Sequence, residues 1–140
     1  MLCDFAQVRE GVLFVASGGV SRFYCPPERP APMPLFLALM IECGPDEALL
    51  AHEVNVRVSH SGTAQELGRA TVAFQAQPTN LNPGEGINVP VALPLGSVGV
   101  TEDGAHDIHV SVDSGAPTIL TAYAMSTIPQ PPPPPQFPSE

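Results

Sequence analysis

Hydrophobic and polar side chains alternate with a period of two along several short stretches of the chain. The clearest stretch is 52–60, where Val54, Val56 and Val58 share one parity and polar residues occupy the positions between them. A period of two places successive side chains on opposite faces of a β-strand. The stretch therefore predicts a strand with one buried face and one polar face.

Similar patterns recur between Gly, Pro and Asn/Asp turn residues for most of the chain. Together with 52–60 they predict about eight strands, at 2–8, 12–24 with an interruption, 35–41, 71–77, 87–94, 107–112 and 118–125. Short strands at this spacing are typical of an antiparallel β-sandwich. We expect an all-β fold of that kind, immunoglobulin-like or jelly-roll-like, with a small barrel as the alternative.

Turn residues suggest how some of these strands connect. Arg9-Glu10-Gly11 predicts a hairpin turn, and Ser17-Gly18-Gly19 predicts a bend where the strand changes sheets. The proline-rich stretch 26–34 is expected to cross between the sheets as an extended connection outside any ladder. Pro90 and Pro94 share one parity, which indicates an edge strand.

The stretch Leu35 to Ile41 differs from the others because it is apolar at both parities. A strand with this pattern is covered on both faces, or its outer face meets another subunit. Otherwise it would expose an apolar patch, so the stretch makes self-association plausible.

The composition changes after residue 126, and Pro129 to Pro138 holds seven prolines in ten residues. We therefore divide the chain into a body, 1–126, and a disordered polyproline II tail, 127–140. Such a segment docks on aromatic grooves at small entropic cost. The expected partner-binding residues are Pro131, Pro132, Pro133, Pro134, Pro135 and Phe137. The alternative is an inert tail.

Charge and composition narrow the classes of partner. Five arginines and no lysine stand against fourteen acidic residues, for a net charge of −9, which opposes binding to nucleic acid or anionic membrane surfaces. No apolar run is long enough to span a bilayer and no secretory signal is visible, so we expect a cytoplasmic protein. Cys3, Cys25 and Cys43 are expected to be reduced and buried.

Candidate chemistry is sparse. His106 and His109 stand among carboxylates, but an offset of three sends them to opposite faces of one strand. His52 and His60 fall at the two margins of an apolar face, about 26 Å apart at ~3.3 Å per residue. No nucleophile motif is present. We therefore expect no metal, no cofactor and no enzymatic activity.

The opening Cys3-Asp4-Phe5-Ala6, the turn at 9–11, the run Val12 to Val15 and the later Gly18-Gly19 with Arg22-Phe23 resemble the start of a family of small bacterial β-rich proteins of unknown function. The resemblance extends through His52-Glu53-Val54 to Met125 and leaves out the tail. It carries over no functional residue. The arginine-only basic set suggests an actinobacterial or actinophage source.

These observations predict a non-catalytic protein-interaction or assembly module, with a protein partner or a second copy as its ligand. One alternative is a phage or particle structural component. Another is a small-ligand or carbohydrate-binding β-sandwich that uses the loops 78–86 and 102–107 at one end of the domain.

Overall fold

The computed structural model describes residues 1–77, 81–127 and 130–136. In these ranges the chain forms eleven β-strands and no helix, so nothing there has the length and apolarity of a membrane-crossing helix. The strands are β1 (Leu2–Arg9), β2 (Val12–Gly18), β3 (Arg22–Tyr24), β4 (Ala31–Pro32), β5 (Phe36–Cys43), β6 (Ala51–His60), β7 (Glu66–Gln75), β8 (Ile87–Pro94), β9 (Gly99–Val100), β10 (Gly104–Val112) and β11 (Thr118–Met125). The predicted all-β class is confirmed. The count exceeds about eight because the predicted run 12–24 forms two strands, β2 and β3, and because the two-residue strands β4 and β9 are too short for alternation to reveal.

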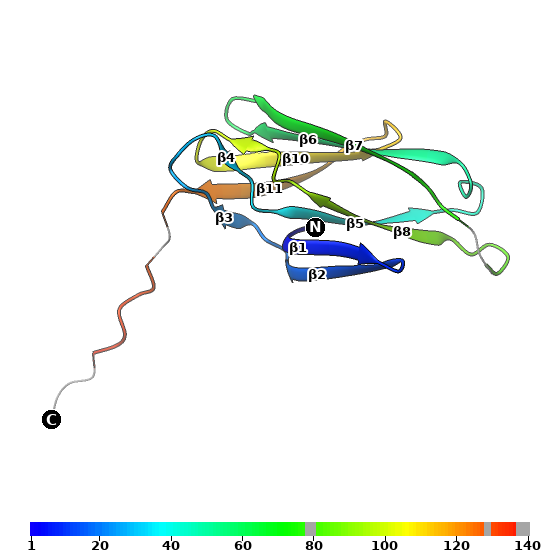
Figure 1. Ribbon diagram of the computed structural model, residues 1–140, viewed down its shortest axis with the longest axis horizontal. Helices are drawn as coiled ribbons and strands as arrows, with labels where there is room; N and C mark the ends of the chain where they lie inside the picture. Colours follow the sequence, from blue (N-terminus) through cyan, green and yellow to red (C-terminus); the bar gives the residue numbers. More distant parts are fainter. Residues whose placement is uncertain (78–80, 128–129, 137–140) are drawn as a thin grey trace.

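Two sheets form the body (Figure 1). One has the order β2-β1-β5-β8 and the other β3-β11-β10-β6-β7, while β4 and β9 form a separate two-stranded ladder. Every described pair is antiparallel except β3 with β11, which is parallel. The five-stranded sheet is therefore mixed, where the sequence predicted antiparallel pairing alone.

The main hydrophobic core lies between the two sheets. Leu37 of β5 packs in one cluster with Val54, Val56 and Val58 of β6 and with Ile108 of β10. The three valines are only 1–2% exposed, so the parity prediction for 52–60 is confirmed. Burial of this alternating set against the facing sheet is the main apolar contribution to folding.

The predicted turns are confirmed by the backbone. Glu10 and Gly11 both have positive φ, 51° and 75°, as a two-residue hairpin turn between β1 and β2 requires. Ser17 (φ 53°) and Gly19 (φ 80°) mark the bend after which β3 joins the other sheet. A left-handed backbone conformation at these positions sets the direction of the chain.

The proline-rich stretch 26–34 runs from β3 to β5 and so connects the two sheets, as predicted. The expectation that it stays outside any ladder is wrong, because Ala31 pairs with Val100 and Pro32 with Gly99. Proline lacks only the donor and its carbonyl still accepts, while Met33 N donates to Val98 O at 3.1 Å. The proline carbonyl and the Met33 N–H are sufficient for a ladder of two residues.

The β1–β2 hairpin leaves its sheet and forms a partial third layer. β1 pairs with β5 only at Leu2 and Cys3, and beyond them Ala6 and Leu13 pack against Ala38 and Ala92 on the outer side of β5 and β8. In Figure 1 the hairpin lies beneath these strands. The chain's own hairpin thus covers part of the outer face of 35–41, where Ala38 is buried, while Met40 stays exposed.

Candidate interaction surfaces

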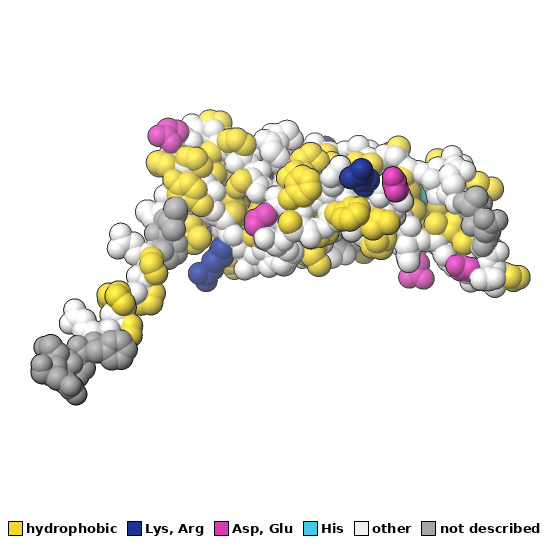
Figure 2. Space-filling view, turned by 60° about the horizontal axis from the view of Figure 1, so that its bottom comes forward, with side chains coloured by type: hydrophobic (Ala, Val, Ile, Leu, Met, Phe, Trp, Pro, Cys, Tyr) yellow, Lys and Arg dark blue, Asp and Glu magenta, His cyan; other side chains and the backbone are white. Residues whose placement is uncertain are grey.

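The hairpin carries an apolar surface. Five large side chains on β1 and β2 are 38–54% exposed: Phe5, Val8, Val12, Phe14 and Val15. The register places Val8 and Val15 on the inward face with Ala6 and Leu13, and the other three on the outward face beside Gln7 and Arg9. We call Phe5, Val12 and Phe14 the hairpin surface. Figure 2 shows hydrophobic side chains spread over this side of the molecule, with basic and acidic side chains among them. An exposed apolar patch is typical of a site that another molecule covers.

The outer edge of the hairpin is also unprotected. β2 is the edge strand of its sheet, and the chain from Gly11 to Ser21 contains no charge and no proline. The opposite edge strand, β8, carries Pro90 and Pro94, and β7 carries Glu66 and Arg69. Prolines and charges are the devices that stop one edge strand from pairing with another. β2 has neither.

Sequence reasoning missed this surface. For 35–41 it left two alternatives, a strand covered on both faces or one whose outer face meets another subunit, and Ala38 is covered, being only 4% exposed beneath the hairpin. The signal was present in the sequence, because Val12 to Val15 is apolar at both parities as well. Only one of the two runs can lie on the outside, and local pattern does not say which.

The predicted partner-binding residues Pro131, Pro132, Pro133, Pro134 and Pro135 are all exposed and belong to no strand. They extend away from the body (Figure 1). Phe137 lies outside the described residues. The structure brings no residue of the body to the five prolines, so their binding role stays a prediction.

The outer face of the five-stranded sheet is polar, in contrast to the hairpin. It is hollowed into a concave site of about 550 Å³ whose lining includes Glu53, Asn55, Arg57, Arg69 and His109. Asn55 accepts a hydrogen bond from Thr71 Oγ1 at 2.9 Å. The polar parity of 52–60 predicted the first three residues, but the sequence did not show that Arg69 and His109 would join them.

Ion pairing in this concave site is uneven. Arg69 donates Nε to Glu66 Oε1 at 2.7 Å and Nη2 to Glu66 Oε2 at 3.1 Å, and this bidentate contact lowers the pKa of Glu66. Arg57 forms no hydrogen bond or ion pair with any residue in the part of the chain that the structure describes. Its charge still attracts Glu66 and helps to lower the pKa of that carboxyl, but no side chain is bonded to its guanidinium in that part of the chain.

The two histidines of the acidic cluster lie on opposite faces of β10, as predicted. His106 is fully buried and packs edge-on against His60 at 5.1 Å between ring centroids, and burial lowers its pKa. His109 lies on the polar face. Within 1–77, 81–127 and 130–136, no three His, Cys, Asp or Glu side chains are grouped so as to hold a metal ion.

His52 and His60 are buried at the two ends of β6, as the parity predicted. His52 Nε2 donates to the Glu47 carbonyl at 2.8 Å, and its Nδ1 lies 2.6 Å from Asp113 Oδ2. The hydrogen bond to Asp113 is the main cause of the raised pKa of His52. Both histidines therefore have structural partners.

The cysteines are free and buried, as expected. Burial raises the pKa of each of the three thiols. Because the thiolate is the nucleophile, a raised pKa makes these cysteines inert at neutral pH. Their positions fit packing roles in the two clusters of the body.

The loop 102–107 and the described part of the other proposed loop, 81–86, lie at opposite ends of the domain, so that form of the small-ligand hypothesis is wrong; 78–80 lie outside the described residues. β7 ends beside the start of β6, where Gln75 pairs with Ala51, and the loop to β8 leaves from there. β10 starts beside the end of β6, where His106 pairs with His60. Strand direction, which alternation does not encode, separates the loops by the length of the sheet.

Comparison with known proteins gives a single match. The model of a family of unknown function (DUF6941) matches residues 1–121. No curated protein and no solved structure matches the chain. The matched range ends within β11 and leaves out the proline tail.

Proposed function

Because the chain belongs to the DUF6941 family of unknown function, we propose a role from its own geometry: a non-catalytic interaction module that associates through the β1–β2 hairpin. The observation that carries the proposal is the hairpin surface, where Phe5 of β1 and Val12 and Phe14 of the uncharged edge strand β2 are each about half exposed. Side chains of this size are costly to leave in water, and a partner that covers them recovers that free energy.

We propose a second copy of the chain as the partner. An antiparallel edge strand is complementary to its own copy about a two-fold axis, because each presents the same unpaired N–H and C=O groups. Val12 to Ala16 can form such a ladder before the left-handed residue Ser17 interrupts it. The molecule is acidic, with a net charge of −9, and pairing through a segment without charges avoids this repulsion.

Sedimentation equilibrium tests the association. The unmodified chain should form a dimer, and Phe14→Asp should raise the dimer dissociation constant at least tenfold while its circular dichroism spectrum stays that of the folded chain. Thr71→Asp, on the polar face, is the matched control and should leave the dimer unchanged. A chain that is monomeric at millimolar concentration, or a Phe14→Asp variant that dimerises normally, would contradict the proposal.

The strand order supports an immunoglobulin-like sandwich for this module. In that fold strands A, B and E lie in one sheet, and G, F, C and C′ lie in the other. The orders β1-β5-β8 and β11-β10-β6-β7 correspond to these two sheets. The hairpin partner β2 is then an addition to the A edge. The arginine-only basic set supports a bacterial origin of the actinobacterial or actinophage kind.

The tail provides a second element of the interaction proposal. Pro131 to Pro135 are exposed and already extended, as ligands of aromatic grooves are. Deleting 129–140 should leave both the melting temperature and the dimer unchanged, because the interface is assigned to the hairpin. A large loss of stability would show that the tail packs on the body instead.

A further inference from the structure

A row of basic side chains crosses the polar face of the five-stranded sheet. Arg57 of β6 is paired directly with Arg69 of β7 on one side and with His109 of β10 on the other. Neighbouring strands lie about 4.8 Å apart, so three potential donors stand in a line roughly 10 Å long. Two of the five basic residues in the whole chain occupy this row.

When no ligand is bound, electrostatic repulsion within this row of basic side chains destabilises the sheet. Like charges at directly paired positions of an antiparallel sheet destabilise it. Glu66 offsets the charge of Arg69 and holds that guanidinium in place, but Arg57 has no such partner among the residues that the structure describes. An anion lying over Arg57 would relieve the repulsion and accept its free N–H groups.

The surroundings of the row define the rest of the ligand. The concave site of about 550 Å³ has the size of a small-molecule site and is lined by the amide of Asn55 and the hydroxyls of Ser111 and Ser114. Glu53, at the other end of the site, can accept hydrogen bonds from hydroxyl groups. No aromatic side chain is among its lining residues, so the ligand is held by hydrogen bonds and charge.

We propose that this concave polar site, centred on Arg57, binds a small hydroxyl-bearing anion such as a sugar phosphate or a sugar acid. Arg57 and Arg69 bind the anionic group, with His109 beside them. Asn55, Ser111 and Glu53 bind the hydroxyls. The acidic net charge of the chain disfavours a polyanion such as nucleic acid at the same place. The site is separate from the hairpin, so either proposal can fail alone.

Isothermal titration calorimetry at low salt tests the proposal with glucose 6-phosphate, glucuronate, inorganic phosphate and glucose. At least one of the first two should bind with a dissociation constant below about 1 mM, which is an ordinary weak affinity. The comparison between them identifies the anionic group. Phosphate alone should bind at least tenfold more weakly, and glucose should not bind. Equal binding of phosphate and the sugar phosphate would indicate an adventitious ion only and would overturn the proposal.

Arg57→Gln should weaken binding at least tenfold, whereas Arg22→Gln on β3 should leave it unchanged. Arg57→Gln should also melt no lower than the unmodified chain when no ligand is present, since the substitution removes a repulsion. Absence of binding by both sugar anions at 10 mM, or full binding by the Arg57→Gln variant, would overturn the proposal.

Discussion

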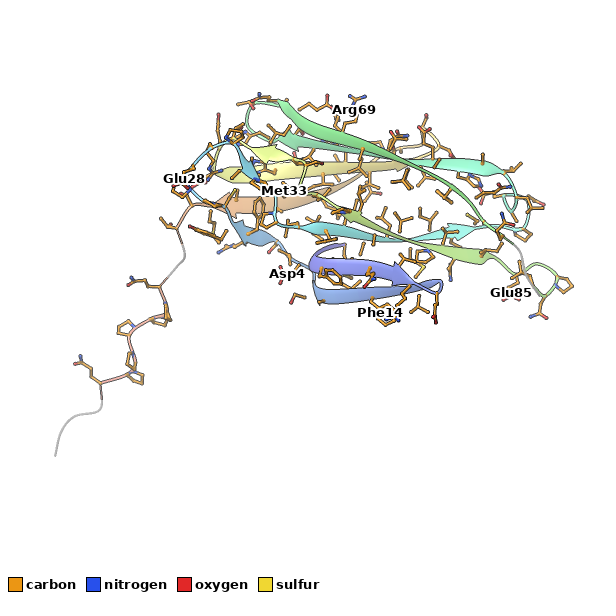
Figure 3. The ribbon with its side chains drawn as sticks, viewed as in Figure 1. Asp4, Phe14, Glu28, Met33, Arg69 and Glu85 are labelled. Carbon is orange, nitrogen blue, oxygen red and sulfur yellow. The ribbon has the colours of Figure 1, made fainter. Side chains whose placement is uncertain are left out.

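The hairpin surface and the polar outer face of the five-stranded sheet lie on opposite sides of the molecule. Their outward positions carry side chains of opposite character, mainly apolar on the first and polar on the second. Figure 3 shows Phe14 below the lower sheet and Arg69 above the upper one. On the polar face, outward side chains bond to one another across strands, as Thr121 Oγ1 does to Asp107 Oδ1 at 2.8 Å. On the hairpin, the outward residues Phe5, Val12 and Phe14 expose hydrocarbon, and Gln7 and Arg9 stand beside them. Identical backbone geometry thus gives one surface suited to water and polar ligands and another suited to a dry contact.

The largest expected effect comes from placing a carboxylate on the buried face of β6 and comparing it with a carboxylate on the polar face. Val56→Asp should unfold the chain, because burying an unpaired carboxylate at a position 2% exposed costs several kcal/mol. Asn55→Asp, one residue away on the polar face, should change the free energy of unfolding by less than about 0.5 kcal/mol. Circular dichroism melts measure both. Equal melting temperatures would refute the assignment of the faces.

A second substitution tests how the hairpin is held. Ala38→Leu should destabilise the protein by about 1–3 kcal/mol, because the hairpin packs directly on this small side chain and leaves no room for a larger one. Met40→Leu, on the same strand but 55% exposed, is the control and should be neutral. Urea denaturation midpoints give the comparison. If the two variants had equal midpoints, the hairpin would not pack where we place it.

A smaller effect is expected at the hairpin turn. Gly11 has a φ of 75° and its added Cβ would meet no atom within 4 Å, so Gly11→Ala should cost only the conformational term, about 1 kcal/mol. Gly96→Ala is the matched control, because its surroundings are equally open and its φ is not positive. The difference in unfolding free energy between the two variants isolates the backbone conformation.

The smallest effect is a pH dependence confined to the five-stranded sheet. The pKa of His52 is raised from 6.5, chiefly by Asp113, so the stability that this pair contributes is complete below pH 6.5 and is lost as the pH rises through the raised pKa. His52→Gln should remove this decline in melting temperature. The hairpin surface contains no histidine, and its dimer should be insensitive over the same range. If the dimer dissociated over the same pH range in which the melting temperature falls, the hairpin surface and the five-stranded sheet would be energetically coupled, contrary to this prediction.

Much of the fold was accessible from alternation and turn residues, because both are local. The parity of 52–60, the turn at Glu10-Gly11 and the sheet change at Ser17–Gly19 depend on a few neighbouring residues each. The starts of β7 and β10 were placed too late by this reasoning. Because β7 and β10 pair with the long strand β6, both begin earlier, at Glu66 and Gly104, in segments where apolar and polar side chains do not alternate.

The sites needed more than local pattern. Parity indicated that Arg57 would face outward, but its pairing with Arg69 and His109 depends on registers between residues 12 and 52 positions apart. The sequence by itself determined most of the strands and their buried faces, since each follows from steric rules acting over a few residues. Tertiary structure alone decided that the hairpin covers β5 and that the basic residues form a row, because both result from contacts between segments that the chain brings together only on folding.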